Sequence, residues 1–161
     1  MKLFRRIATR FSYGLDYLAR LAIFLLMSLV ISNVILRFFG SPVRGTVEWV
    51  EFLTAMVIGL SLSYCAVQGG HIAVGLLVDK LERKMQLVIS IFINLVSFLF
   101  LLIVFWRIIS YADSIRRAGQ VSLTTGTPYY PFIIIIAIGF LAYSLIIMAD
   151  LLDDLKVVQR K

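Results

Sequence analysis

The side chains that could carry out chemistry are few in this sequence. There is one histidine, His71, and one cysteine, Cys65, so neither a multi-histidine metal site nor a CxxC pair can form. The one glycine cluster, GGHIAVG, lacks the strand–turn–helix setting of a nucleotide-binding loop. Because no reacting groups come together, we predict that the chain is not an enzyme and binds no cofactor or metal of its own.

Two glutamates, Glu48 and Glu51, stand at the start of the apolar segment TVEWVEFLTAMVIGLSLSYCAV. Carboxylates at a helix start complement the helix dipole and contact water. Glu51 also shares a helix face with Ala55, Gly59 and Ser63, which recur at every fourth residue. Small side chains in a row let another helix approach closely in lipid. This face therefore either packs within the chain's own bundle or binds a second membrane protein, with Glu51 at its rim.

The polar groups deeper in the apolar segments are neutral. Asn33 and Asn94 are better explained by hydrogen bonds between helices than by contacts to a substrate. His71 is best explained as a polar residue at a helix end, with an interfacial hydrogen bond or a pH-sensitive contact as alternatives. A secondary transporter usually needs a charged or broken helix near the membrane midplane. The pattern therefore favours a helper subunit over transporting machinery.

The composition predicts an all-α integral membrane protein. Of the 161 residues, 61% are hydrophobic and 16% are charged, and the mean hydropathy is +0.96. Soluble domains have roughly 45–50% apolar and about 25% charged residues. The formal net charge of +7 is spread over short segments between apolar runs, which is typical of membrane orientation and not of nucleic-acid binding. The partner implied at this level is the lipid bilayer.

The elements that position these side chains are four apolar runs, each long enough to cross about 30 Å of hydrocarbon. The predicted spans, within a single membrane domain of residues 1–161, are 19–38, 47–67, 86–106 and 129–149. Residues 2–17 are basic and have apolar residues at helical spacing, so we predict an N-terminal amphipathic helix in the membrane interface. Residues 71–83 are too short and too charged to cross, so we predict a short interfacial arm there. Lys and Arg concentrate near both termini and in the arm, which predicts that both termini are cytoplasmic.

Several residues flank these spans. Helical signals continue outward to Arg117, and three aspartates, Asp150, Asp153 and Asp154, begin a short polar tail. Arginines and lysines at span ends, together with tryptophan and tyrosine, suit headgroup depth. The predicted interfacial anchors are Arg5, Arg6, Arg10, Trp49, Lys80, Arg83, Lys84, Trp106, Tyr129 and Tyr130.

The order of these features resembles the small membrane subunit of tripartite ATP-independent periplasmic (TRAP) transporters, the DctQ-like or Q subunit. The resemblance covers almost the whole chain, and its strongest motif is the arm Gly70-His71-Ile72. The other matching elements are the acidic-aromatic helix start (Gly45, Glu48, Trp49, Glu51), the loop 122–128 and Ile138-Gly139-Phe140 in the last span. In the arm, Gly75 stands where an acidic residue is expected, and the next acidic residue is Asp79.

The resemblance implies a role that the spacing of residues does not show. It implies a fixed scaffold in the bacterial inner membrane that braces a large, elevator-type M subunit. That M subunit would bind sodium and import a small organic acid delivered by a periplasmic binding protein. The residues proposed to contact the M subunit are Glu48, Glu51, Ala55, Gly59, Ser63 and His71. Those proposed to contact the binding protein are Arg107, Arg116 and Arg117.

Two other functions fit the same sequence. A small autonomous transporter acting as a homodimer would need a titratable carboxylate in a span, and Glu48 and Glu51 are the only candidates. An accessory or assembly subunit of another membrane complex would have a different partner. Identification of the proteins that co-purify with the chain separates these functions from the first.

Overall fold

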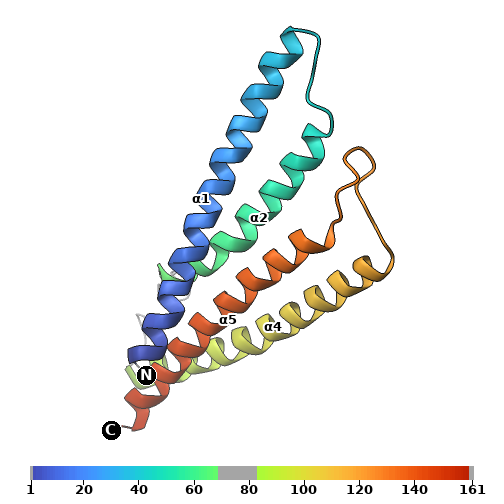
Figure 1. The fold of residues 1–161 in the computed structure, drawn as a ribbon. Helices are drawn as coiled ribbons and strands as arrows, with labels where there is room; N and C mark the ends of the chain where they lie inside the picture. Colours follow the sequence, from blue (N-terminus) through green and yellow to red (C-terminus); the bar gives the residue numbers. More distant parts are fainter. Residues whose placement is uncertain (1, 69–82, 160–161) are drawn as a thin grey trace.

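The computed structural model describes residues 2–68 and 83–159, which form four long helices (Figure 1). The helices are α1 (Lys2–Phe38), α2 (Thr46–Val67), α4 (Arg83–Arg117) and α5 (Tyr130–Gln159). In these two ranges there is no strand, only an isolated bridge between Val121 and Pro128. Each helix is long and apolar enough to cross a membrane. The predicted all-helical protein with four spans is confirmed at this level.

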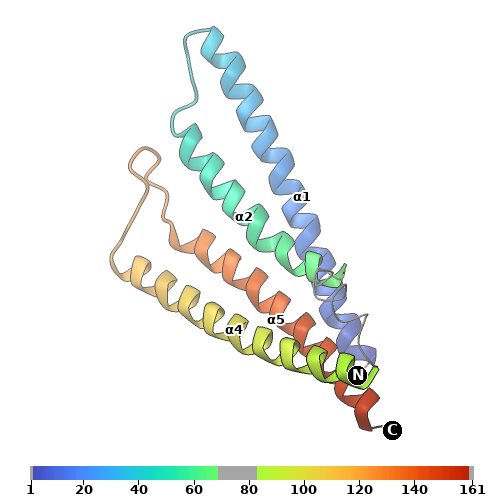
Figure 2. The same cartoon turned by 180° about the vertical axis from the view of Figure 1, so that it is seen from behind.

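The helices lie in one fan-shaped layer in the order α1, α2, α5, α4. Of the described helices, α2 packs against α1 and α5, α1 also touches α5, and α4 contacts α5 alone. Figures 1 and 2 show from both sides that the helices converge where the chain termini lie and spread apart toward the loops 39–45 and 118–129. We call the first the terminal end of the layer and the second the loop end.

The closest approach within the layer is between α2 and α5, where Gly59 crosses Gly139. A Cβ atom on Gly59 would lie 2.9 Å from the Cα atom of Ile136, and a Cβ atom on Gly139 would overlap the carbonyl group of Gly59. Ser63, one turn after Gly59, is fully buried. Small residues at this interface let the two backbones pack closely, which stabilises helix pairs in lipid. At Gly59 and Ser63 the structure therefore shows packing within the chain.

The sequence predicted a helix at residues 2–17 separate from the first span. In the structure, both segments belong to one uninterrupted helix, α1. The segment contains no proline, and its single Gly14 lowers helix propensity by only about 1 kcal/mol. One side of the segment, which carries Ala8 and Leu15, packs inside the layer. Ala8 joins a cluster with α2 and α5, and Leu15 joins a second one. The apolar residues Ile7 and Phe11 of the same segment are exposed, so contact of this segment with the membrane surface stays a prediction.

The other element boundaries differ from the predictions mainly in length. The helical continuation of the third span to Arg117 is confirmed, because α4 ends there. The predicted polar tail is instead the last part of α5, which continues to Gln159. The interfacial arm 71–83 lies outside the described residues except for Arg83, where α4 begins.

Candidate partner-binding surfaces

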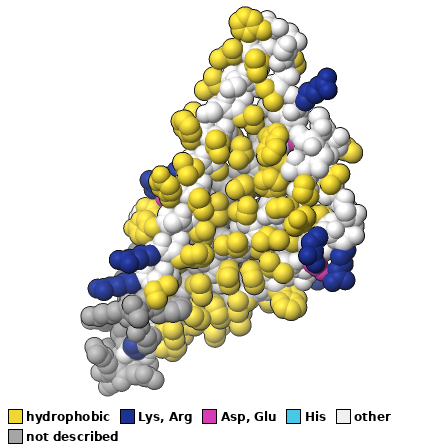
Figure 3. Space-filling model, viewed as in Figure 1, with side chains coloured by type: hydrophobic (Ala, Val, Ile, Leu, Met, Phe, Trp, Pro, Cys, Tyr) yellow, Lys and Arg dark blue, Asp and Glu magenta, His cyan; other side chains and the backbone are white. Residues whose placement is uncertain are grey.

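The outer helices present mainly apolar side chains to their surroundings. In the view of Figure 3, hydrophobic side chains cover the middle of the molecule, and Lys and Arg lie toward its rim. Exposed examples are Phe24 on α1 (67%) and Phe92 (66%) and Ile103 (63%) on α4. Together with the four span-length helices, this distribution is that of a multi-pass membrane protein.

At the loop end, Glu48 holds the α4–α5 loop on the start of α2. Its two carboxylate oxygens accept hydrogen bonds from the backbone N–H groups of Thr124 (2.9 Å) and Thr125 (3.1 Å). The Thr125 side chain also lies against Gly45, the residue before α2. Two charge-assisted bonds to neighbouring backbone groups fix the loop more firmly than neutral ones would. Glu48 thus acts within this chain, a contact that the spacing of residues did not predict.

The aromatic residues predicted as interface anchors have different surroundings. Trp49 and Tyr129 contact Phe52, with ring centroids 6.0 Å and 5.4 Å apart, and Phe52 stacks on Phe132 at 4.2 Å. These rings join α2 to the start of α5. Trp106, by contrast, is 71% exposed in the half of α4 that is nearer the loop end, and Tyr130 is half-buried.

The predicted row Glu51, Ala55, Gly59 and Ser63 splits into two parts. Gly59 is buried against α5, Ser63 is also buried, Ala55 is half-buried, and Glu51 is exposed. Within the described residues, Glu51 takes part in no hydrogen bond or ion pair. Glu51 is therefore the member of the row that remains available to a partner. His71 lies outside the described residues.

At the terminal end, the aspartates of α5 connect both outer helices. Asp150 and Asp153 form ion pairs with Arg5 of α1, at 3.5 Å and 3.1 Å. Asp154 accepts hydrogen bonds from α4, from the Ser90 hydroxyl at 2.6 Å and the Asn94 amide at 3.0 Å. The predicted interhelical bond of Asn94 is thus confirmed. The role of the aspartates was missed, because three of them near the end of an apolar run read as a solvated tail.

Asn33 differs from the sequence interpretation, and Asp16 was not singled out from the sequence. Asn33 accepts a hydrogen bond from the backbone N–H of Val43 at 3.0 Å, so it holds the loop after α1 and not a second helix. Asp16 is buried in α1 and pairs with Arg20 at 2.6 Å. The Arg20 guanidinium lies 5.9 Å from the ring centroid of Tyr64 on α2. The spacing of Asp16 and Arg20, one helical turn apart, was the signal that could have found this pair.

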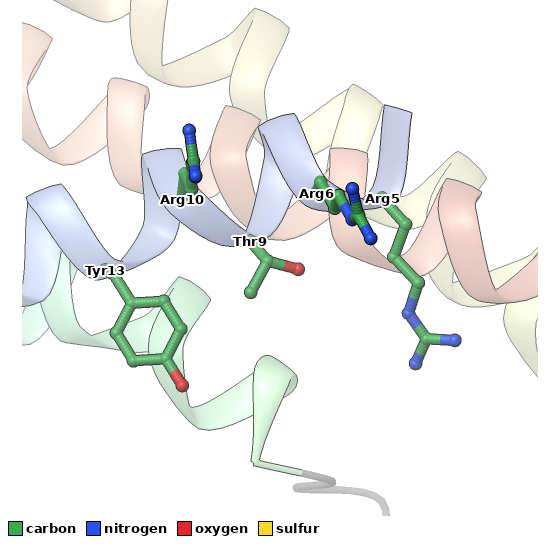
Figure 4. A pocket seen from close by; sticks show the side chains of 5 residues that line it. All are labelled: Arg5, Arg6, Thr9, Arg10 and Tyr13. Carbon is green, nitrogen blue, oxygen red and sulfur yellow. The ribbon is translucent and has the colours of Figure 1, made fainter. Parts of the chain in front are cut away.

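Three predicted anchors line a basic cavity of about 510 Å³ on α1 (Figure 4). The lining residues, all from α1, are Arg5, Arg6, Thr9, Arg10 and Tyr13. Tyr13 extends toward α2, where its ring meets Tyr64 edge-on at 5.3 Å. This cavity lies beside the C-terminal end of α2, because Thr9 also lines a second, small cavity together with Val67, the last residue of α2. Lys80 lies outside the described residues, while Arg83 and Lys84 form the first turn of α4.

The arginines predicted to contact a binding protein lie in the part of α4 that is nearer the loop end. Arg107 is exposed and has no ion-pair partner in the part of the chain that the structure describes. Arg116 and Arg117 both pair with Asp113, at 3.0 Å and 2.7 Å. All three arginines are exposed and belong to the last third of α4. Two of them, Arg116 and Arg117, are already paired within the chain.

The described residues contain no group of three or more His, Cys, Asp or Glu side chains placed to hold a metal ion. A family model described as "Tripartite ATP-independent periplasmic transporters, DctQ component" matches residues 26–157, which is more than half of the chain. The chain belongs to this family. The DctQ component is part of a transporter, and the family is not one of enzymes. No curated protein and no solved structure matches the chain.

Proposed function

We propose that this DctQ component is the fixed scaffold subunit of a sodium-coupled, binding-protein-dependent importer of a small organic acid. It braces a large elevator-type M subunit in the bacterial inner membrane, with both of its own termini in the cytoplasm. It also helps a periplasmic binding protein to dock at the loop end. Sodium and substrate bind the M subunit, and this chain carries no cofactor.

The observation that supports a scaffold role is the single-layer arrangement of the helices. A chain that carries a solute across the bilayer alone needs helices around a polar path. Here α4 touches α5 alone among the described helices, so the four spans do not enclose such a path. Their apolar outer surfaces suit lipid or another membrane protein. The basic cavity on α1 suits anchoring at the cytoplasmic headgroups.

Reconstitution tests the proposal directly. Proteoliposomes containing the M subunit and this chain, supplied with the binding protein and an inward sodium gradient, should take up an organic acid. Vesicles lacking this chain should show at most a small fraction of that uptake. Uptake by vesicles that contain this chain alone, lost in Glu51→Gln, would instead establish the autonomous transporter. Co-purification with an unrelated complex would establish an accessory subunit.

A further inference from the structure

The face of α2 that points away from α5 carries a continuous exposed strip. Its members are spaced at three, four or seven residues, so they lie on one side of the helix. We call it the outer strip, and it consists of Val47, Glu51, Thr54, Ile58 and Cys65. The opposite face contains the buried residues Phe52, Gly59, Leu60, Ser63 and Ala66.

The outer strip differs chemically from the exposed surface of α4. The exposed residues of α4 from Val88 to Ile103 are all apolar and need nothing but lipid around them. The outer strip contains a carboxylate at Glu51 and a hydroxyl at Thr54. Charged side chains in membrane spans are costly in lipid and almost always meet protein or water.

Glu51 lies too far along α2 to be an ordinary helix-start residue. It follows the first helical residue, Thr46, by five positions, which is about 8 Å along the axis. Glu48, one turn earlier, already binds the α4–α5 loop. Glu51 has no hydrogen-bond or ion-pair partner in the described residues.

We infer that the outer strip of α2 binds a transmembrane helix of the M subunit, and that this helix presents a cationic side chain to Glu51. The inference rests on the proposed function. Charge complementarity selects this partner over a second copy of the chain. A two-fold pairing of outer strips would bring two Glu51 carboxylates toward each other, and like charges in an interface repel. Arginine is the cation best suited to a partly buried carboxylate, because its planar group binds both oxygens.

Site-specific photo-cross-linking in the complete transporter tests the location. A photoreactive phenylalanine analogue is placed at Thr54 or Ile58, and at Phe92 or Ile103 of α4 as controls. We expect both α2 positions to cross-link to the M subunit at least about tenfold more than the α4 positions, because contact range is short. Cross-links from α2 to lipid or to a second copy would overturn the inference. So would stronger cross-linking to the M subunit from α4.

Charge variants test the chemistry. In an affinity pull-down, Glu51→Lys should reduce recovery of the M subunit by about tenfold or more, and Glu51→Gln by less, because only lysine places like charges together. Arg37→Glu, an exposed charge reversal at the end of α1, should leave recovery unchanged. Equal losses for Arg37→Glu and Glu51→Lys, or none for Glu51→Lys, would contradict the inference alone. If the wild-type chain recovers no M subunit, the proposed function itself fails.

Discussion

The inner helices of the layer, α2 and α5, and the outer helices, α1 and α4, differ in how much of their surface the chain itself covers. In an apolar 18-residue window of each span, 28% of the α2 residues and 39% of the α5 residues are buried. The corresponding shares are 6% for α1 and 11% for α4. The inner pair is held by close backbone contact at two glycines. The outer helices pack on this pair along one side only, with polar contacts at the terminal end, and their other side faces the surroundings.

This difference teaches how the layer can be both stable and open to a partner. Burial between membrane helices comes from tight packing, so a pair that crosses at glycine needs little else. Helices without such a crossing contribute apolar surface that the bilayer or a neighbouring subunit covers. The polar contacts between the outer helices and α5 lie at the terminal end, and single substitutions can test each of them.

The largest expected effect follows from Gly139→Ala in the inner pair. The added Cβ atom would overlap the Gly59 carbonyl group, so the helices must separate. We expect a loss of about 3 kcal/mol or more in the free energy of unfolding, the upper end of the usual cost of overpacking, because the added atom meets backbone. Thermal unfolding of the purified protein in mild detergent, followed by circular dichroism, measures it.

The matched control for this substitution is Gly14→Ala on α1. No atom lies within 4 Å of a Cβ atom placed on Gly14, so the control should be neutral or slightly stabilising. Equal unfolding temperatures for the two variants would contradict the backbone crossing. Gly59→Leu should also unfold the chain, so a lower recovery of the M subunit with that variant would not by itself demonstrate a docking role for Gly59.

The next largest effect compares how α5 holds its two outer neighbours. Asp154→Ala removes the acceptor of two hydrogen bonds from α4, Ser90 and Asn94. We expect it to cost about 1.5–3 kcal/mol, as for hydrogen bonds to a charged group. Arg5→Gln removes the ion pairs to α1, but the Arg5 side chain is 60% exposed, so we expect less than about 1 kcal/mol. Unfolding in denaturant compares the variants, and the reverse order would show that α1 is the more firmly held helix.

These contacts also show what the sequence could and could not predict. The four spans and the helical structure up to Arg117 follow from the hydropathy of the chain and the helical spacing of its apolar residues. Both signals depend only on residues that are near each other in the sequence. The pairing of Gly59 with Gly139 does not, because two rows of small residues do not reveal which helix each one meets. The roles of Asp154 and Glu48 were missed for a related reason. A carboxylate near either end of a helix suits water, and at the helix start it also suits the helix dipole, as for Glu48. Only the fold brings a distant donor to it.

A smaller and local effect is expected from Glu48→Ala at the loop end. The backbone N–H groups of Thr124 and Thr125 lose their carboxylate acceptors, so the loop should open more often. We expect amide hydrogen exchange at these two residues to become about tenfold faster, with little change in the unfolding temperature. Thr54→Val is a suitable control, because it alters α2 without touching the loop. Unchanged exchange rates would mean that the loop is held by its own internal bonds.

The smallest expected effect is on the uptake rate, from charge changes at the loop end of α4, and it assumes the proposed function. If Arg116 and Arg117 attract the binding protein by their charge, the double variant Arg116→Glu/Arg117→Glu should slow uptake a few-fold at low salt. The effect should shrink at physiological salt, because exposed charges are screened within about 8 Å. Uptake by proteoliposomes at two ionic strengths measures it.

Asp113→Asn separates this role from a structural one. Asp113 is the ion-pair partner of both arginines, so its neutralisation breaks the same contacts as the double variant. It nevertheless raises the positive charge at this end of α4, so attraction predicts unchanged or faster uptake at low salt. If the arginines matter only because they fix the end of the helix, Asp113→Asn should slow uptake as much as the double variant does. That slowing would be the same at both salt concentrations, and α4 would then have no part in recruiting the binding protein.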